Sequence, residues 1–217
     1  EKGDDVPVQM PRREFIKTLN AAGAFVVSVP LASAQDSDAE NTPFVPNAWL
    51  RIPTQGRIQF FLDKCEMGQG VFTGLPMIAA EELDVHPHDI EVLFAPADRQ
   101  YVNAAFGIQT TGGSTSTSSS YDPLRQAGAD ARETLLQAAA SVWSVPRSQC
   151  ESERGHAIHR PSGRKLPYGK LARQAATLGV KTGTLKDPKT FQTIGKPIAR
   201  HDACLLYTSP SPRDMPR

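Results

Sequence analysis

Two short glycine-rich segments, each followed at once by a helix-forming stretch, constrain the fold of this chain more than any other feature. The first loop is 66–70 (EMGQG) and the second loop is 111–115 (TGGST). Glycines let the backbone approach a ligand closely, and the start of a helix adds unpaired N–H donors and a positive dipole end. Two such loops could hold both ends of a long, anionic, ring-containing cofactor. The residues expected to contact it are Gly68, Gln69, Gly70, Gly112, Gly113, Ser114 and Thr115.

The side chain of Gln69 narrows the kind of ligand that the first loop suits. Its amide is both a donor and an acceptor, which fits the edge of a heterocycle better than a bare phosphate. Neither loop is a Walker A loop or a dinucleotide fingerprint, because the lysine of the former and the third glycine of the latter are missing. A glycine pair before a helix is also typical of a simple turn, and a Ser/Thr run is typical of a solvated linker.

Short apolar runs separated by turn residues predict the strands. Residues 53–56 (PTQG) have turn chemistry, so strands over 48–52 and 57–62 are expected to form a hairpin. Further strands are expected over 90–94 and 156–159.

The helices follow from apolar residues at helical spacing. A helix is predicted over 75–83, with Pro76 in its first turn. A second is predicted over 123–143, with Asp122 as N-cap before Pro123, and a third over 168–178. Because strands and helices alternate without a clean βαβ repeat, we expect an α+β fold: a mixed sheet with two or three packed helices.

Composition excludes several classes of protein. Lys and Arg number 24 against 23 Asp and Glu, a net charge of +1, which argues against broad neutralisation of a nucleic acid. No apolar run approaches the roughly 20 residues of a membrane-spanning helix. The three cysteines lack CxxC spacing and are odd in number, so neither a zinc site nor a disulfide scaffold is expected; they are Cys65, Cys150 and Cys204. No catalytic or metal-ligating residue is assigned.

The N-terminal residues 1–34 have the layout of a bacterial export peptide. Paired arginines in 11–17 (PRREFIK) precede a weakly apolar stretch over 21–31 and a small-residue site at 32–34 (ASA). The paired arginines resemble the twin-arginine type, so a periplasmic location is expected, with 35–47 as a linker. The alternative is an amphipathic N-terminal helix with chance arginines.

The C-terminal residues 204–217 contain CLLYTSPSPRD, which resembles the translation of a sequencing adapter. We expect this tail to be non-native, although a natural disordered tail is the alternative. Residues 48–183 are then the main domain of a longer protein, and 184–203 (with IGKPIARHDA) its connection to a further domain.

The order of motifs resembles the molybdopterin-binding large subunits of the xanthine dehydrogenase/aldehyde oxidase superfamily, in particular isoquinoline 1-oxidoreductase beta subunits. The motifs that carry the resemblance include DKCEMGQGVFTGLPMIAAEELDV and QTTGGSTSTSSSYDPLRQAGADAR. It implies that both loops contact molybdopterin cytosine dinucleotide with molybdenum. Such enzymes hydroxylate an aldehyde or N-heterocycle with water-derived oxygen, and electrons leave through an iron–sulfur small subunit to a downstream acceptor.

The resemblance also implies that this chain is inactive alone, since the family's catalytic glutamate lies near the far C-terminal end, in a region that the chain lacks. Glu66 is expected to orient its own loop, and Glu81 and Glu82 to lie on a solvated helix face. Cys65 is interpreted as a small buried thiol. The histidines are interpreted as surface turn residues: His86, His88, His156, His159 and His201.

Two other classes of protein stay open: an exported phosphate- or nucleotide-binding module without catalysis, and an exported structural domain. A structural domain would place the two loops far apart. A complete module should bury its apolar faces, whereas a piece of a larger enzyme should leave an apolar patch beside the loops.

Overall fold

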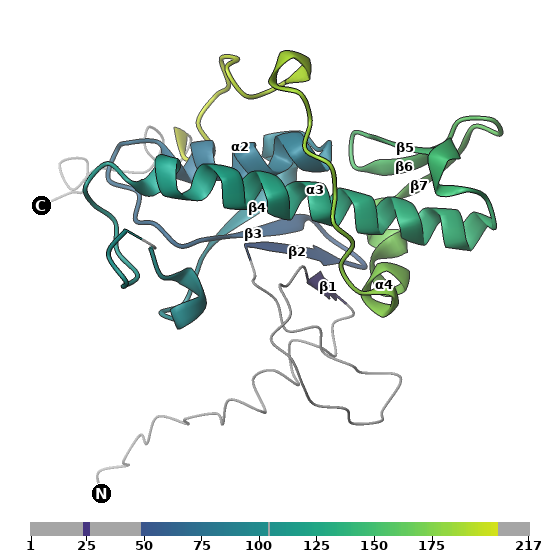
Figure 1. Ribbon diagram of the computed structural model, residues 1–217. Helices are drawn as coiled ribbons and strands as arrows, with labels where there is room; N and C mark the ends of the chain where they lie inside the picture. Colours follow the sequence, from purple (N-terminus) through teal and green to yellow (C-terminus); the bar gives the residue numbers. More distant parts are fainter. Residues whose placement is uncertain (1–23, 27–48, 104, 204–217) are drawn as a thin grey trace, which may run out of the picture.

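The computed structural model describes residues 24–26, 49–103 and 105–203 (Figure 1). The expected export peptide (apart from 24–26), the expected linker and the expected tail lie outside the described residues. The described residues form an α+β domain, as the sequence predicts, with one mixed sheet, one small antiparallel sheet and three α-helices. None of the described helices is long and apolar enough to cross a membrane.

The larger sheet has four strands in the order β1-β2-β3-β4. Its strands are β1 (Ala24–Val26), β2 (Leu50–Pro53), β3 (Ile58–Leu62) and β4 (Ile90–Phe94). Strands β2 and β3 form the predicted antiparallel hairpin, whereas β4 pairs with β3 in parallel. Strand β1, which lies within the expected export peptide, pairs with β2. In β3 the side chains of Phe60 and Leu62 are buried on the same face, as the alternation of a strand requires.

Helix α2 (Val71–Leu83) connects the parallel strands β3 and β4. It begins four residues before the predicted start, because the first loop itself caps its first turn. Pro76 therefore lies in the second turn, not the first as predicted. There its ring removes one backbone bond, which the buried contacts of Leu75, Ile78 and Leu83 outweigh.

Helix α3 (Ser116–Trp143) also begins earlier than predicted. The Ser/Thr run is the first turns of the helix, and Asp122 and Pro123 lie exposed within it instead of starting it. Tertiary packing against α2 outweighs the local preference of Asp-Pro for a helix start. At Gly128 a Cβ atom would lie 2.6 Å from the carbonyl oxygen of Ala79 in α2, so only glycine allows this close crossing.

The smaller sheet lies at the far end of α3 from its N-terminus (Figure 1). Its antiparallel strands are β5 (Cys150–Glu153), β6 (His156–His159) and β7 (Arg164–Pro167), followed by helix α4 (Tyr168–Leu178). The predicted strand over 156–159 and helix over 168–178 are confirmed. The remaining turns are short 3₁₀ helices: η1 (Pro87–Asp89), η2 (Arg99–Tyr101), η3 (Arg147–Gln149) and η4 (Pro188–Thr190).

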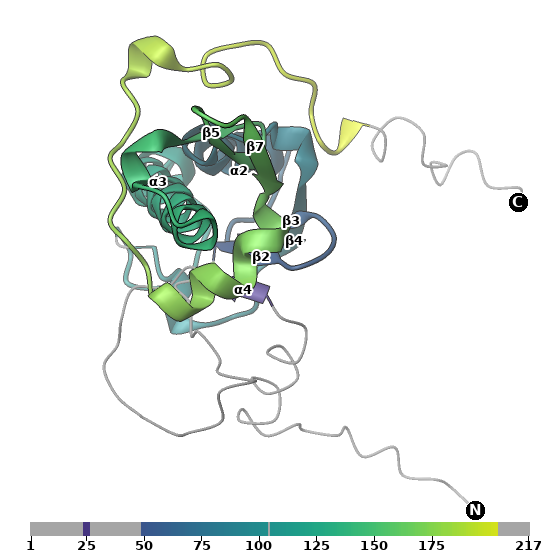
Figure 2. The ribbon, with the colours of Figure 1, turned by 90° about the vertical axis from the view of Figure 1, so that its right-hand side faces the viewer.

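Helices α2 and α3 run side by side over one face of the larger sheet (Figures 1 and 2). Helix α4 lies beside strands β1 and β2. The core between these layers is built from fully buried aliphatic and aromatic side chains. Its largest members are Tyr168, Phe60, Leu50, Ile52, Leu62, Leu75, Leu83, Ile90, Leu124, Leu135 and Leu171. The Tyr168 hydroxyl donates to the Leu83 carbonyl, at 3.0 Å, so the one polar atom of that ring is satisfied.

Residues 179–203, here called the strap, follow α4 and cross back over α3 and α2 toward the start of α2 (Figure 1). The strap has little regular structure, yet side chains of both helices hold its backbone. Thr134 accepts from the N–H of Lys181, and Thr73 accepts from the N–H of His201. The segment expected to connect to a further domain thus packs on this domain over 184–203.

Candidate functional site

The first loop is held in shape by the carboxylate of Glu66. This carboxylate accepts three backbone N–H bonds of 2.8, 2.9 and 2.8 Å from Gly68, Gly70 and Phe72, respectively. Burial alone raises the pKa of Glu66, but the three N–H bonds and the charge of Arg200 outweigh it and lower the pKa below its ordinary value. The predicted role of Glu66 in orienting its own loop is confirmed.

The start of α2 is closed to an external anion by the same carboxylate. The N–H groups of Gly70 and Phe72 donate to Glu66, and those of Thr73 and Gly74 donate to the carbonyl of Gly70. The helix start expected to bind an anion is therefore filled by a side chain of the protein itself.

Gln69 is also used internally. Its amide nitrogen donates to the carbonyl of Cys65 at 2.8 Å, and its amide oxygen accepts from the N–H of Met67 at 2.5 Å. Gln69 thus braces the loop, while the residue is exposed and its amide keeps one further N–H and one further lone pair for a ligand. The Cys65 side chain is exposed, so its interpretation as a buried thiol is wrong.

The second loop has a different construction. Gly113 and Ser114 have φ angles of 60° and 55°, the left-handed region that favours glycine. The Thr115 hydroxyl accepts from Asn103 at 2.8 Å and donates to the carbonyl of Gly112 at 2.9 Å.

The start of α3 stays open to an acceptor. Thr115 is the N-cap residue but makes no side-chain capping bond. Among the described residues, nothing accepts from the N–H groups of the first turn, Ser116, Thr117 and Ser118. Thr117 and Ser118 are exposed, and the Ser118 hydroxyl donates to the Thr115 carbonyl at 3.4 Å.

The two loops meet. The backbone N–H of Cys65, directly before the first loop, donates to the hydroxyl of Thr111 in the second loop at 2.8 Å. Both loops lie at the same end of the domain, where α2 and α3 begin (Figure 1). Cys65 and Thr111 are 46 residues apart in the sequence, yet one hydrogen bond joins them directly. The two loops therefore form a single surface. The structural-domain alternative expects the two loops to lie far apart, and the bond between them contradicts this.

Large apolar side chains surround this surface and remain exposed. Met67, Phe94, Phe106 and Ile108 are 69%, 64%, 49% and 61% exposed, respectively. The ring of Phe106 lies against Gly113, where a Cβ atom would come within 2.9 Å of it. An exposed apolar patch beside the loops is the feature expected of a piece of a larger enzyme.

Sequence reasoning missed Arg200, which reaches the first loop from the strap. Its guanidinium donates to the Gly68 carbonyl at 3.2 Å and to the Glu66 carboxylate at 3.3 Å. Two further bonds, of 2.8 and 2.7 Å, hold it on Asp202. These bonds to Asp202 are the main cause that raises the pKa of Arg200, and in return they lower the pKa of Asp202.

The prediction that Glu81 and Glu82 lie on a solvated face of α2 is wrong, because these residues are 2% and 0% exposed, respectively. Glu82 pairs with Arg125 at 2.7 Å and with Arg132 at 3.4 Å. The Glu81 carboxylate accepts from strap residues Gln192, Thr193 and Ile194. Burial raises the pKa of Glu81, but these bonds outweigh it and lower the pKa below its ordinary value.

Among the histidines, His159 is buried and His88 stacks on His201. His159 is only 5% exposed and bonds to Ser162 and Gln149, so its surface interpretation is wrong. His88 stacks on His201 of the strap, with ring centroids 4.5 Å apart. Burial, followed by the charge of His88, lowers the pKa of His201. Within 24–26, 49–103 and 105–203, no three His, Cys, Asp or Glu side chains are placed to hold a metal ion.

Curated relatives match most of the chain. It is 40% identical over 173 residues to the beta subunit of isoquinoline 1-oxidoreductase from Brevundimonas diminuta, covering 76% of this chain and 22% of that protein. It is 26% identical over 168 residues to the membrane-bound aldehyde dehydrogenase [pyrroloquinoline-quinone] of Gluconacetobacter polyoxogenes, covering 75% and 21%. The chain thus spans about a fifth of the length of these relatives.

Solved structures give more distant matches. Quinoline 2-oxidoreductase from Pseudomonas putida 86 matches with a TM-score of 0.44 and 20% identity, over 57% of this chain and 15% of that one. CO dehydrogenase from Oligotropha carboxidovorans matches with a TM-score of 0.45 and 20% identity, over 65% and 18%. The profile of the molybdopterin cofactor-binding domain family matches residues 12–203. The chain therefore belongs to the molybdopterin cofactor-binding domain family.

Proposed function

We propose that this chain is the part of a molybdenum hydroxylase large subunit in which two glycine loops hold the molybdopterin cofactor. The observation that carries the proposal is the bond between Cys65 and Thr111, which joins the loops into one surface. The residues proposed to contact the cofactor are those expected from the sequence: Gly68, Gln69, Gly70, Gly112, Gly113, Ser114 and Thr115. The second loop presents mostly small residues and hydroxyls, which suits a bulky organic ligand that must lie close to the backbone.

The two loops would contact different parts of the cofactor. Because Glu66 already fills the start of α2, the first loop offers glycine backbone and little anion affinity. The second loop and the first turn of α3 offer free N–H groups and the hydroxyls of Ser114, Thr117 and Ser118. The phosphate-bearing part of the cofactor therefore belongs at the second loop. The cytosine dinucleotide form is the one that we propose.

When bound, the molybdenum cofactor supplies a two-electron oxidation and the transfer of water-derived oxygen to a substrate carbon. This chain contributes binding, orientation and exclusion of water. The exposed apolar patch of Met67, Phe94, Phe106 and Ile108 supports enclosure of the cofactor by further parts of the enzyme. The 217 residues alone are therefore expected to oxidise no substrate.

The names of the relatives support a proposal for the substrate class. Their names include an isoquinoline oxidoreductase, an aldehyde dehydrogenase and a component of nicotinate dehydrogenase from Pseudomonas putida. We propose an aldehyde or an aromatic N-heterocycle as substrate, and an iron–sulfur small subunit that passes electrons to a further acceptor. A periplasmic location, by the twin-arginine route, rests on the pattern of residues 11–34.

The test is to purify the complete large subunit with its small partner and measure molybdenum by mass spectrometry, together with the nucleotide released by acid. Molybdenum accompanied by a cytosine nucleotide is the expected result. A tightly bound nucleotide without molybdenum would instead favour the nucleotide-binding module. Absence of both would end the proposal, and substrate oxidation by the 217-residue chain alone would contradict its division of roles.

A further inference from the structure

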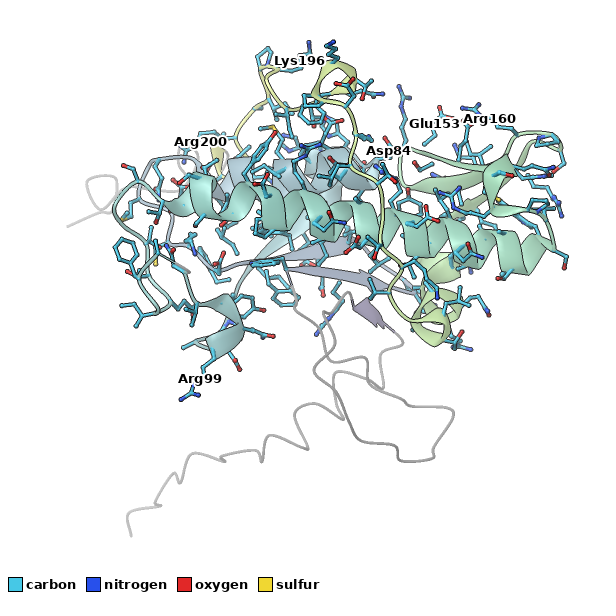
Figure 3. The ribbon with its side chains drawn as sticks, viewed as in Figure 1. Asp84, Arg99, Glu153, Arg160, Lys196 and Arg200 are labelled. Carbon is cyan, nitrogen blue, oxygen red and sulfur yellow. The ribbon has the colours of Figure 1, made fainter. Side chains whose placement is uncertain are left out.

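Arg200 is the strap residue that touches the first loop. It lies near the starts of α2 and α3, at the opposite end of the domain from Arg160 and Glu153 (Figure 3). Its Nη1 contacts the Gly68 carbonyl, and its Nη2 contacts both Glu66 and Asp202. The planar guanidinium thus spans three acceptors on two segments that are 132 to 134 residues apart.

The charges in this cluster depend on one another. Glu66 and Asp202 both accept from the same nitrogen of Arg200, so removing that cation leaves two neighbouring carboxylates unpaired. Glu66 in turn holds the N–H groups of Gly68, Gly70 and Phe72. A change at Arg200 is therefore transmitted through Glu66 to the backbone of the first loop.

The strap around Arg200 is fixed independently. The next residue, His201, donates its N–H to Thr73 in the first turn of α2 at 3.0 Å. Farther back, Glu81 of α2 holds the strap at Thr193, through bonds of 2.7 Å to its N–H and hydroxyl. Arg200 therefore reaches the loop from a seated segment, and it differs in this from an ordinary surface ion pair.

We propose that Arg200 is a positioning residue for the cofactor loop: by pairing with Glu66 and Gly68 it makes the shape of the first loop depend on a seated strap. The proposal rests on the proposed function, because it assigns to that loop a cofactor to hold. Lysine cannot replace arginine here without loss, since one ammonium cannot match three acceptors that a planar fork reaches at once.

The experiment compares Arg200→Ala, Arg200→Lys and Asp202→Asn with the wild type in the complete large subunit with its small partner. The first readout is hydrogen exchange, by mass spectrometry, of the amides in 66–72. The second is molybdenum content per polypeptide. Arg160→Ala is the matched control, because Arg160 also pairs with a carboxylate, Glu151 at 2.6 Å, but lies far from the loops.

In Arg200→Ala the 66–72 amides should exchange about tenfold faster, as expected for loss of a charge-assisted contact that orders a loop. Molybdenum content should fall, Arg200→Lys and Asp202→Asn should lie between Arg200→Ala and the wild type, and Arg160→Ala should match the wild type. Unchanged exchange in Arg200→Ala, or an equal change in Arg160→Ala, would overturn the proposal. Faster exchange with full molybdenum content would overturn the link to cofactor binding.

These outcomes separate the two proposals. If the wild-type subunit carries no molybdenum, the proposed function fails, yet the exchange data still decide whether Arg200 positions the loop. If any variant fails to fold, exchange in the buried parts of α3 and α4 reports it, and the remaining two variants decide.

Discussion

The two glycine loops follow the same sequence logic but reach opposite states. In the first loop, Glu66 lies four residues before the N-cap Gly70 and fills the start of α2 with its own carboxylate. In the second loop, the residues around the N-cap Thr115 carry only hydroxyls, and no side chain caps the start of α3. Glycines before a helix therefore do not by themselves make an anion site. The nearest acidic side chain decides whether the helix start is available.

The largest effect is expected from Glu66→Ala, which would turn the first loop into an open one. Three N–H groups and the Arg200 guanidinium would lose their shared acceptor. Local opening of 66–72 should become easier by about 2 kcal/mol, or about 30-fold faster amide exchange. Hydrogen exchange on the complete subunit measures this. Glu153→Ala, at an exposed position of β5, should leave the loop unchanged, and a silent Glu66→Ala would refute the capping role.

Gly113→Ala tests the second loop. An alanine there must adopt a φ of 60° and displace the ring of Phe106, at a cost of about 1–2 kcal/mol. The cofactor content of the complete enzyme should fall with it. Gly163→Ala is a matched control, since Gly163 has a φ of 67° with no atom near its Cβ position and lies far from the loops. Equal molybdenum loss in both variants would show that backbone strain alone, and not the loop, is responsible.

Ser118→Glu would make the second loop resemble the first. Ser118 is the third residue of α3 and is exposed, so a glutamate there places a carboxylate beside the N–H groups and the positive dipole end of the helix start. The apo domain should gain about 0.5 kcal/mol in stability, while molybdenum content drops because the new charge occupies the anion position. Ser141→Glu, near the C-terminal end of α3, should have the opposite effect on stability and none on cofactor. Full cofactor content in Ser118→Glu would place the phosphates elsewhere.

The smallest expected effect is a local pH dependence at the first loop. The pKa of Glu66 is lower in the folded protein than its unfolded value of about 4.3, so its contribution is complete above that value. The contribution is lost as pH falls through the lowered folded pKa. Amide protection of Gly68, Gly70 and Phe72 should therefore weaken at acid pH, whereas the first turn of α3 should show no such transition. Hydrogen exchange at a series of pH values, corrected for intrinsic rates, tests it.

Much of the fold could be predicted because the signals are local. Turn residues and short apolar runs located the hairpin of β2 and β3, strand β4, strand β6 and the full extent of α4. The meeting of the two loops was expected only on the hypothesis that both hold one cofactor, because the sequence left open a structural domain with distant loops. What failed was the start of α3, where Asp122 and Pro123 form a good local cap that contact with α2 overrides.

The buried carboxylates could not be predicted from neighbouring residues. Glu82 finds Arg125 at a separation of 43 residues and the N–H of Lys186 at 104. Two adjacent acids in a helix are ordinarily exposed, and here the arginines of α3 for Glu82 and the strap for both acids make their burial possible. Arg200 was missed because its partners in the first loop are also far away in the sequence, at separations of 132 and 134 residues. Its motif was interpreted as a connection to another domain.

The burial of Glu81 and Glu82 beneath the strap constrains biosynthesis. Helix α2 emerges from the ribosome about a hundred residues before Lys186 and Thr193, the groups that neutralise or bond its acids. Until those residues arrive, Glu81 lacks its strap partners, whereas Glu82 can already pair with Arg125 and Arg132 of α3, so α2 stays incomplete on the side that the strap covers. The order of synthesis thus delays completion of the domain until its last segment is made, and Arg200 reaches the first loop only at that closing step.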